Sequence, residues 1–387
     1  CSQLSSVSDS TKNPTYSPSR ATLTKYAVMS LLAFLSFGLT GLGAIVVMFA
    51  LSTLRAGRDS AASHGISSQN SSRLGGVAIV ITFVLFLIGM VLLSSYTPGV
   101  VRDVTFLHLW STVFVCVILG GAEDIKADLL SPYFRLVVKL LVFGFFLWTT
   151  PNVIPASIGV PGVDYLFSFS WVAWGLCTLF CVGFINAFNM ADGANGLIPG
   201  IVTIAFGIFF LEYGRPAEAI LFFVCLMFLI FNVVSGWFFL GDMGSYGLGA
   251  AIVCYGLLGV AEGDFSAGFM ACLLSYPCVD FVVSVIRRMR KGLSPLQADN
   301  GHLHNRLYRF YAQNFTSRTT PNSLTGLTIS GASSGVCLII YALGWIPVES
   351  NAWFGVFGLQ FAVYLIALSR LRSSQMDESE AMSGVSG

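Results

Sequence analysis

The chain has 387 residues, of which 55% are hydrophobic and only 10% are charged, and its formal net charge is +1. Its mean hydropathy is +0.78. This composition excludes a soluble globular protein, because too few polar residues remain to cover the surface of one. We therefore expect the lipid bilayer to be its solvent, and we expect no nucleic-acid partner.

Apolar runs close to the ~20 residues that a helix needs to cross the hydrocarbon core recur along the chain. The predicted spans are 26–52, 75–97, 104–122, 133–150, 167–187, 197–211, 216–238, 245–260, 265–286, 324–345 and 351–369. They predict an all-α polytopic membrane protein with about 10–11 transmembrane helices in one domain, 25–372. The tails 1–24 and 373–387 lack apolar periodicity, and we expect both to be disordered.

The orientation follows from Lys and Arg, which favour cytoplasmic loops. The predicted cytoplasmic loops are 53–74, 121–134, 186–196, 239–246 and 287–323. The opposite loops hold only Arg102 and Arg215. We expect about eleven spans, with the N-terminus outside and the C-terminus inside. The N-terminal Lys12, Arg20 and Lys25 are the exception to this arrangement.

The first polar motif is the adjacent pair Glu123 and Asp124, where the third predicted span leaves the membrane. Adjacent carboxylates at a membrane exit are costly to desolvate, so a cation, a basic substrate or bulk water must stabilise them. The pair alone fits a binding site and a solvated loop end equally well.

The second motif, 186–196, places the side chains of Asn186, Asn189, Asp192 and Asn195 between two apolar runs. Carboxylate and amide oxygens suit a hard cation such as Mg2+, and Asn amides also suit the polar edge of a nucleobase. A plain turn built from Asn, Asp and Gly is the alternative, but the density of polar groups favours a site.

The third motif, 239–246, contains Asp242 flanked by glycines and a serine between two apolar helices. The Asp could hold a metal while the glycines let phosphate approach the backbone closely. Phe239, just before it, could stack on a nucleobase. A glycine-rich turn of this kind is weak evidence by itself.

The fourth motif lies in the basic loop 287–323, where His302 and His304 stand two residues apart. The pair could bind zinc, but no third Cys or His ligand is near in the sequence, which favours phosphate contact or proton transfer. The basic cluster 287–291 is better explained as a cytoplasmic anchor.

The four motifs, in this order and on these spans, resemble the polyprenyl-phosphate N-acetylhexosamine-1-phosphate transferases of glycosyltransferase family 4, over roughly residues 64–310. These membrane enzymes load a sugar phosphate onto a lipid carrier. The resemblance implies transfer from a UDP-N-acetylhexosamine to undecaprenyl phosphate, with release of UMP, at the cytoplasmic face of the bacterial inner membrane. It also implies Mg2+, or alternatively Mn2+, as the cofactor.

The resemblance also assigns roles to individual residues. Glu123 and Asp124 occupy the paired-acid motif, where one carboxylate orients or deprotonates the acceptor phosphate. Asp242 matches the metal-binding aspartate, with Asn189 as a second ligand and Asp192 close by. The remaining expected site residues are His302 and His304 in the histidine loop, Arg135 at the diphosphate, Asn195 and Phe239 at the uracil, and Arg73, Asn186 and Arg306 as further substrate contacts.

The chain departs from the family pattern at four positions. Glu123 stands where Asp is usual, and Asn195 stands where many bacterial members have Asp. Lys139 replaces a usual Gln, and Asn305 replaces a third His found in some relatives. The longer side chain of Glu123 puts its role as the base in question, whereas nucleotide binding at Asn195 is expected to be kept.

The expected chemistry needs cations, because two anionic groups must meet. Two like unit charges at about 4 Å repel by ~4 kcal/mol at an effective dielectric constant near ~20. A metal on Asp242, with Arg135 and the histidine loop, would offset this repulsion.

Three alternatives stay open at this stage. Within the family, the chain could transfer phospho-N-acetylmuramoyl-pentapeptide, but its histidines are not consecutive, which favours UDP-N-acetylglucosamine or a related sugar for surface polysaccharides such as lipopolysaccharide O-antigen. A secondary transporter would place ionisable groups near the membrane centre, and no internal repeat is visible. Thr40 and Ala44 could serve a homodimer, although ordinary helix packing explains them better.

Overall fold

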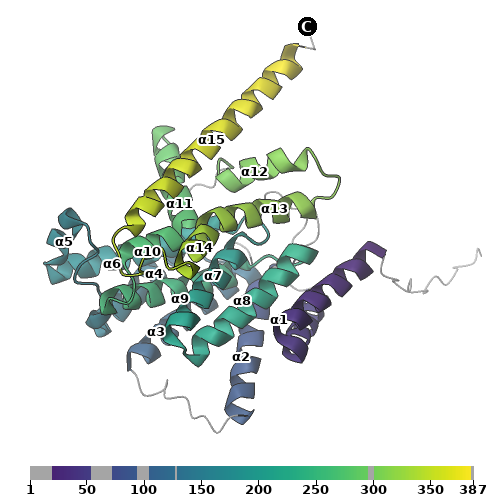
Figure 1. Ribbon diagram of the computed structural model, residues 1–387. Coiled ribbons are helices and arrows are strands. Elements are labelled where there is room, and N and C mark those ends of the chain that lie inside the picture. The colour runs from purple at the N-terminus through teal and green to yellow at the C-terminus, as the bar shows by residue number, and fades with distance from the viewer. Residues whose placement is uncertain (1–19, 54–71, 94–103, 127–128, 295–299, 385–387) are drawn as a thin grey trace, which may run out of the picture.

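The computed structural model describes residues 20–53, 72–93, 104–126, 129–294 and 300–384 (Figure 1). Its helices, in chain order, are α1 (Arg20–Ser52), α2 (Gly75–Leu93), α3 (Val104–Ile125), α4 (Pro132–Thr149), η2 (Pro151–Val153), α5 (Pro161–Phe167), α6 (Ser170–Ala191), α7 (Leu197–Tyr213), α8 (Pro216–Ser235), α9 (Gly241–Glu262), α10 (Ala267–Leu273), α11 (Ser275–Arg290), α12 (Leu303–Ala312), α13 (Thr319–Ser330), η3 (Gly331–Gly335), α14 (Val336–Ala342) and α15 (Trp353–Gly384). Across these ranges the only β-pairing is an isolated bridge between Ser72 and Phe238.

The prediction of an all-α polytopic membrane protein is confirmed. Among the described residues, eight helices are long and apolar enough to cross a membrane. The pair α10 and α11, bent by 81°, counts as a ninth candidate, and α2 and α7 are shorter apolar helices. The predicted span 265–286 is therefore a broken helix.

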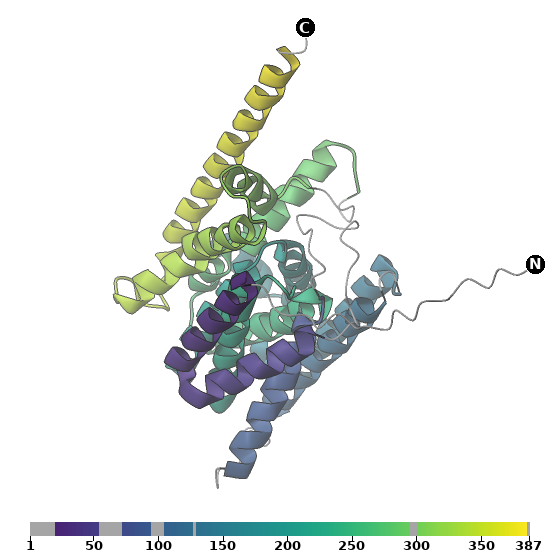
Figure 2. The same ribbon diagram turned by 90° about the vertical axis from the view of Figure 1, so that its right-hand side faces the viewer.

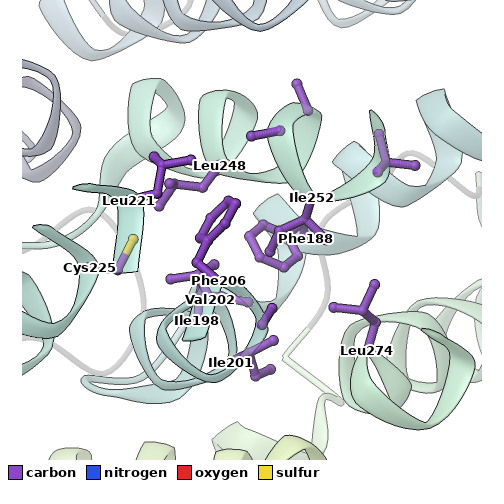
Figure 3. Close-up of a cluster of buried hydrophobic side chains, with 14 of the residues drawn as sticks. Phe188, Ile198, Ile201, Val202, Phe206, Leu221, Cys225, Leu248, Ile252 and Leu274 are labelled. Carbon is purple, nitrogen blue, oxygen red and sulfur yellow. The ribbon is translucent and has the colours of Figure 1, made fainter. Parts of the chain in front are cut away.

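Helix α9 is the centre of the bundle. In the most apolar 18-residue stretch of α9, 89% of the residues are buried, whereas the value for α15 at the periphery is 6%. Its abundant glycines let neighbours approach closely. Side chains of α9 pack with those of α6, α7 and α8 in the core. Figure 3 shows Phe188, Phe206, Leu248 and Ile252 directed toward one another.

The bundle has two chemically different ends. The acidic end, as we call it, contains Asp124, Asp192 and Asp242 at the ends of α3, α6 and α9. At the opposite end the Arg215 guanidinium lies 4.7 Å from the centre of the Phe106 ring. The polar motifs therefore gather at one face of the protein.

Most of the motif residues lie on helix ends and not in loops. Helix α3 continues through the first motif to Ile125, α6 reaches Ala191, and α9 begins at Gly241. The predicted loops 121–134, 186–196 and 239–246 are shorter than expected, because polar side chains there satisfy backbone groups of neighbouring helices. Helix α12 lies unpredicted within the loop 287–323, and α15 runs to Gly384, past the predicted start of the C-terminal tail.

Helix α1, predicted as one span, reverses its direction in the middle. Phe37 (φ −142°, ψ 20°) and Gly38 (φ 59°, ψ −137°) are not helical. A methyl group on Gly41 would lie 2.2 Å from the Ala33 carbonyl oxygen, although residues eight apart in a continuous helix are separated by ~12 Å. Figure 2 shows the two arms of α1, in purple, meeting at a sharp bend.

Gly120 tests the packing of α3 on α9. A methyl group at this position would lie 2.2 Å from the Asp242 carbonyl oxygen. Because backbone must shift to admit it, we expect Gly120→Ala to lose about 1–3 kcal/mol of stability. Thermal unfolding of the detergent-purified protein measures the loss. The matched control is Gly175→Ala on α6, where no atom lies within 4 Å of the added methyl group, and equal unfolding midpoints for both variants would contradict the packing.

Candidate active site

Asp124 caps the N-terminus of α9. Its Oδ1 accepts a hydrogen bond from the Asp242 backbone N–H at 2.9 Å, and its Oδ2 accepts one from the Met243 N–H at 2.8 Å. A carboxylate at this position satisfies two backbone donors that lack partners within the helix and complements the helix dipole. Asp124 is 7% exposed. This carboxylate is therefore committed to holding α3 and α9 together.

The adjacent Glu123 has a different environment. Its Oε1 lies 3.5 Å from Arg135 Nη1, and the same nitrogen lies 3.4 Å from Asp242 Oδ2. Arg135, on α4, thus joins carboxylates from α3 and α9. The Glu123 Oε2 accepts a long hydrogen bond from the Leu130 N–H at 3.3 Å. Of the two adjacent acids, Glu123 is the one whose charge faces the guanidinium of Arg135 and not the N-terminus of α9.

Asp192 and Asn189 complete the acidic end. Asp192 caps the C-terminus of α6. Burial, reinforced by the charges of Asp242 and Asp124, raises the pKa of Asp192 to about 8. Asn189 Oδ1 accepts a hydrogen bond from Ser245 Oγ at 2.6 Å, one turn beyond Asp242. Three carboxylates and one amide oxygen therefore converge from three helices.

This donor set fits a hard divalent cation. Mg2+ prefers carboxylate, amide and water oxygens, and it often binds through one or two carboxylates plus substrate phosphates. Asp242 and Asp192 are the carboxylates left for this role, since Asp124 is occupied by the backbone of α9. A cation would also offset the charges of Asp242 and Asp124, which add to the effect of burial in raising the pKa of Asp192.

The segment before α2 lies along the segment before α9. Ser72 N–H donates to the Trp237 carbonyl, and Phe239 N–H donates to the Ser72 carbonyl, both at 2.9 Å. This pairing places Arg73 where its charge acts on Asp124 and Asp242. The predicted residues Arg73 and Phe239 therefore lie beside each other at the acidic end, although they are far apart in the sequence.

Two predicted amide residues have partners of their own. Asn186 accepts a hydrogen bond from Lys139 Nζ, and this ammonium also lies 4.4 Å from the centre of the Tyr246 ring. Asn195 is 3% exposed, and its Oδ1 accepts from Asn232 Nδ2 at 3.4 Å. The role of Asn195 as a nucleobase contact stays a prediction, because its amide belongs to a buried network.

The histidine loop lies against the second motif. His302 and His304 are 5% and 3% exposed, and a methyl group on Gly193 would lie 2.2 Å from His304 Nε2. Burial lowers the pKa of His304 to about 4, although the Asp280 charge acts in the opposite direction. His304 is therefore neutral near pH 7 and cannot supply a positive charge to a phosphate.

Asp280 gives the histidines a third possible metal ligand. Ligand atoms of Asp280, His302 and His304 lie within 4.8 Å of one another. The distance between His302 Nδ1 and Asp280 Oδ2 is 2.5 Å, whereas two ligands of one tetrahedral zinc ion lie about 3.3 Å apart. The distance is that of a hydrogen bond, and contact of these histidines with phosphate or transfer of a proton by them stays a prediction.

Arg306 points to the C-terminal helix. Its Nη1 donates to the Leu368 carbonyl of α15 at 2.8 Å. Sequence reasoning also left out Asp280 and Lys139 as site residues. Each is an ionisable residue flanked by apolar residues on its helix, and an ionisable residue at membrane depth is itself a signal of function. Their partners, which lie on other helices, could not be identified from spacing.

The comparisons with known proteins agree with this geometry. Residues 106–260 match the family model described as glycosyl transferase family 4, which includes the motif residues on α3, α6 and α9 but not the histidine loop. The chain is 36% identical over 135 residues to the phospho-N-acetylmuramoyl-pentapeptide-transferase of Synechococcus sp. (strain JA-2-3B'a(2-13)), a match covering 34% of this chain and 39% of the relative.

Two longer matches carry another name. The chain is 29% identical over 274 residues to the undecaprenyl-phosphate alpha-N-acetylglucosaminyl 1-phosphate transferase of Thermotoga maritima, covering 70% of this chain and 78% of the relative. It is 28% identical over 261 residues to a Bacillus subtilis protein named "Probable undecaprenyl-phosphate N-acetylglucosaminyl 1-phosphate transferase", covering 65% and 70% respectively. The Synechococcus match, by contrast, spans about two fifths of that relative's length.

The two adjacent acids should differ in their contribution to stability. Because Asp124 satisfies two N–H groups of α9, we expect Asp124→Asn to cost about 1–2 kcal/mol. Glu123→Gln should cost less, since it faces Arg135 and leaves the helix end intact. Thermal unfolding of both variants in one detergent measures the difference. A larger loss for Glu123→Gln would overturn the capping role.

Proposed function

We propose that this chain, which carries a glycosyl transferase family 4 region, transfers an N-acetylhexosamine 1-phosphate from a UDP-sugar to undecaprenyl phosphate and releases UMP. The observation that carries the proposal is the arrangement at the acidic end, where Arg135 lies between Glu123 and Asp242 with Asp192 and Asn189 beside them. Phosphoryl transfer requires this combination of oxygen ligands and fixed positive charge.

Each residue has a part in the proposed transfer. An oxygen of the lipid phosphate attacks the β-phosphorus of the UDP-sugar, and the bond to the UMP oxygen breaks. Glu123 orients the acceptor phosphate or takes its proton, and Arg135 offsets charge on the transferring group. Asp242, with Asn189 and Asp192, would hold Mg2+, or alternatively Mn2+, which neutralises the diphosphate when bound.

The backbone of α9 supports the same step. Asp242 lies in the first turn of the helix, where the dipole favours negative charge. The N–H groups of Asp242 and Met243 are already bonded to Asp124, so the helix would act on a phosphate through its dipole and not through these two N–H groups. Phe239, immediately before α9, would stack on the uracil ring.

An apolar cavity supports a lipid acceptor. It has a volume of about 440 Å³ and is lined by side chains of α5, α6, α9, α10 and α15, among them Cys177, Phe184, Ile252, Met270 and Phe357. Phe184 lies five residues before Asn189 on α6, which is a rise of ~8 Å. A polyprenyl chain in this cavity would bring its phosphate toward the acidic end.

The distribution of charge supports a cytoplasmic active site in the bacterial inner membrane. Helix α11 ends with three basic residues, and its basic end lies next to the histidine loop. Basic residues at helix ends favour the cytoplasmic side. UDP-sugars would then reach the site from the cytoplasm, and the product would enter surface polysaccharide synthesis, of which lipopolysaccharide O-antigen is one example.

N-acetylglucosamine is the sugar we favour, with phospho-N-acetylmuramoyl-pentapeptide as the second candidate. The matches to the Thermotoga and Bacillus proteins extend over 70% and 65% of this chain, against 34% for the Synechococcus protein. The sequence His302-Leu303-His304-Asn305 also lacks consecutive histidines. Comparing the two nucleotide sugars in one assay separates the candidates.

Mg2+-dependent formation of a labelled lipid tests the reaction. We expect purified protein to transfer label from UDP-N-acetylglucosamine to undecaprenyl phosphate with release of UMP, and Asp242→Asn to reduce the rate by at least about 100-fold because it removes the negative charge of a metal ligand. Glu212→Gln is the matched control, since Glu212 accepts from Tyr341 at the opposite end and should leave the rate unchanged. Near-normal turnover of Asp242→Asn would exclude the metal assignment.

No product from the wild-type protein with any UDP-N-acetyl sugar would exclude the reaction itself. In that case, uptake of labelled substrate into vesicles without a lipid product would support a transporter.

A further inference from the structure

Asp280 is a buried carboxylate within the broken helix pair and is 1% exposed. Its Oδ1 accepts hydrogen bonds from Tyr364 Oη at 2.8 Å and from the Leu303 N–H at 3.2 Å. Its Oδ2 faces His302 Nδ1 at 2.5 Å. One carboxylate on α11 thus joins the N-terminus of α12 and the side of α15.

A carboxylate buried this deeply is costly unless its partners satisfy it. Here both oxygens have partners, so Asp280 holds the start of α12 against α11. Because an ionised carboxylate only accepts hydrogen bonds, His302 must carry a proton on Nδ1. The contact therefore fixes both the orientation of the imidazole ring and its tautomer.

Helix α15 supports α11 and the start of α12 from outside the bundle. Tyr364 and Leu368 lie one turn apart on α15, and they contact Asp280 and Arg306 respectively. Figure 1 shows α15 running beside α11 and α12. The two contacts place the histidine loop between the bundle and its most peripheral helix.

We propose that Asp280 and Tyr364 are positioning residues for the transfer, acting through His302. This inference rests on the proposed function. Asp280 holds the His302 ring in one tautomer, and Tyr364 holds the Asp280 carboxylate in the orientation that this contact requires. Outer partners of this kind typically change activity by about 10- to 100-fold when they are removed.

The test compares three conservative variants, Asp280→Asn, Tyr364→Phe and Tyr341→Phe. The last is the matched control, because Tyr341 also donates to a carboxylate, Glu212, but at the opposite end. The rate of lipid product formation is divided by the number of UMP-binding sites, so that misfolded protein does not count. A purely structural role would lower the number of sites and leave the rate per site unchanged.

We expect the rate per site to fall at least about 10-fold in Asp280→Asn, to fall by less in Tyr364→Phe, and to stay unchanged in Tyr341→Phe. An unchanged rate per site in both Asp280→Asn and Tyr364→Phe, with an active wild-type protein, overturns the inference alone. An inactive wild-type protein overturns the proposed function instead, so the two failures are distinguishable.

Helix α1 carries a second, independent inference about membrane topology. Its bend frees backbone carbonyls within an apolar segment, and two hydroxyl groups hydrogen-bond to carbonyls there. Ser36 Oγ donates to the Leu32 carbonyl at 2.8 Å, and Thr40 Oγ1 donates to the Phe37 carbonyl at 2.7 Å. Leu35 and Leu39, on either side of the bend, are 71% and 80% exposed. A bend with satisfied carbonyls and exposed leucines suits a hydrocarbon environment.

Both arms of α1 extend from this bend toward the acidic end. Phe37 lies 4.5 Å from Phe223, ring centre to ring centre, part of the way along α8. The far end of the first arm is fixed by Lys25, whose Nζ donates to the Ser235 carbonyl at 3.0 Å. The far end of the second arm is fixed by Phe49, whose ring lies 6.3 Å from that of Trp237.

We propose that α1 is a re-entrant helical hairpin, which enters the membrane from the face of the acidic end and returns to it. Phe223 lies twelve residues before Ser235 on α8, so the bend reaches a depth of roughly 18 Å and stops within the ~30 Å core. The start of α1 then lies on the same side as the active site. This explains why Lys25 is an exception in the predicted orientation.

Labelling with a membrane-impermeant maleimide tests the hairpin in right-side-out and inverted vesicles. The background is Cys1→Ser, which keeps eight cysteines and whose own labelling is subtracted, and one cysteine is added at Ser10, Asn314 or Glu349. Asn314 follows α12 near the acidic end, and Glu349 precedes α15 at the opposite end. We expect Ser10→Cys to react from the same side as Asn314→Cys. Reaction from the same side as Glu349→Cys would overturn the hairpin.

Discussion

The contact between the Asp124 carboxylate and the N-terminus of α9 is the constraint on which the rest of the site depends. A helix that begins at the membrane boundary presents N–H groups that neither the helix nor lipid can satisfy. Asp124 satisfies two of them from α3. Gly120, one turn earlier, leaves the room that this approach requires. The result is that Glu123 and Asp242 come to face the same guanidinium, that of Arg135.

This constraint also separates two residues that the sequence presents as equivalent. Adjacent residues on a helix point in directions about 100° apart, so Glu123 and Asp124 cannot serve the same atom. One carboxylate is used to build the site, and the other faces the arginine that would meet substrate. The longer side chain of Glu123 fits the second role, because it must reach past the end of α3 toward Arg135 on the next helix.

The sequence predicts much of this arrangement, but not all of it. Long apolar runs identify the membrane helices, because hydropathy alone determines where a helix can meet lipid. The polar motifs identify Asp192 and Asp242 for a similar reason, since carboxylates between apolar runs need a function or water. The predicted helix boundaries were less accurate. Asp124 on α3 stabilises the first turn of α9, and the sequence of α9 itself does not reveal this contact.

The reversal of α1 could not be predicted for a related reason. Gly38 is one of several glycines in an unbroken apolar run, and composition does not show which of them adopts a positive φ. The choice depends on packing, since Phe37 docks against Phe223 on α8 while Lys25 finds a carbonyl at the end of that helix. The charges of the N-terminal segment were the available signal, because they disagreed with the predicted orientation.

The length of α6 connects the apolar and polar halves of the proposed reaction. Its middle, with Cys177 and Phe184, lines the apolar cavity, and its last turns carry Asn186 and Asn189 into the acidic end. Because the rise of a helix is fixed, the distance from cavity to carboxylates is fixed as well. A lipid whose chain lies in the cavity would therefore present its phosphate at one depth in the membrane. A nucleotide sugar bound by the loops would react with the lipid phosphate at that depth. This geometry gives a physical reason why a water-soluble donor would require an enzyme within the membrane.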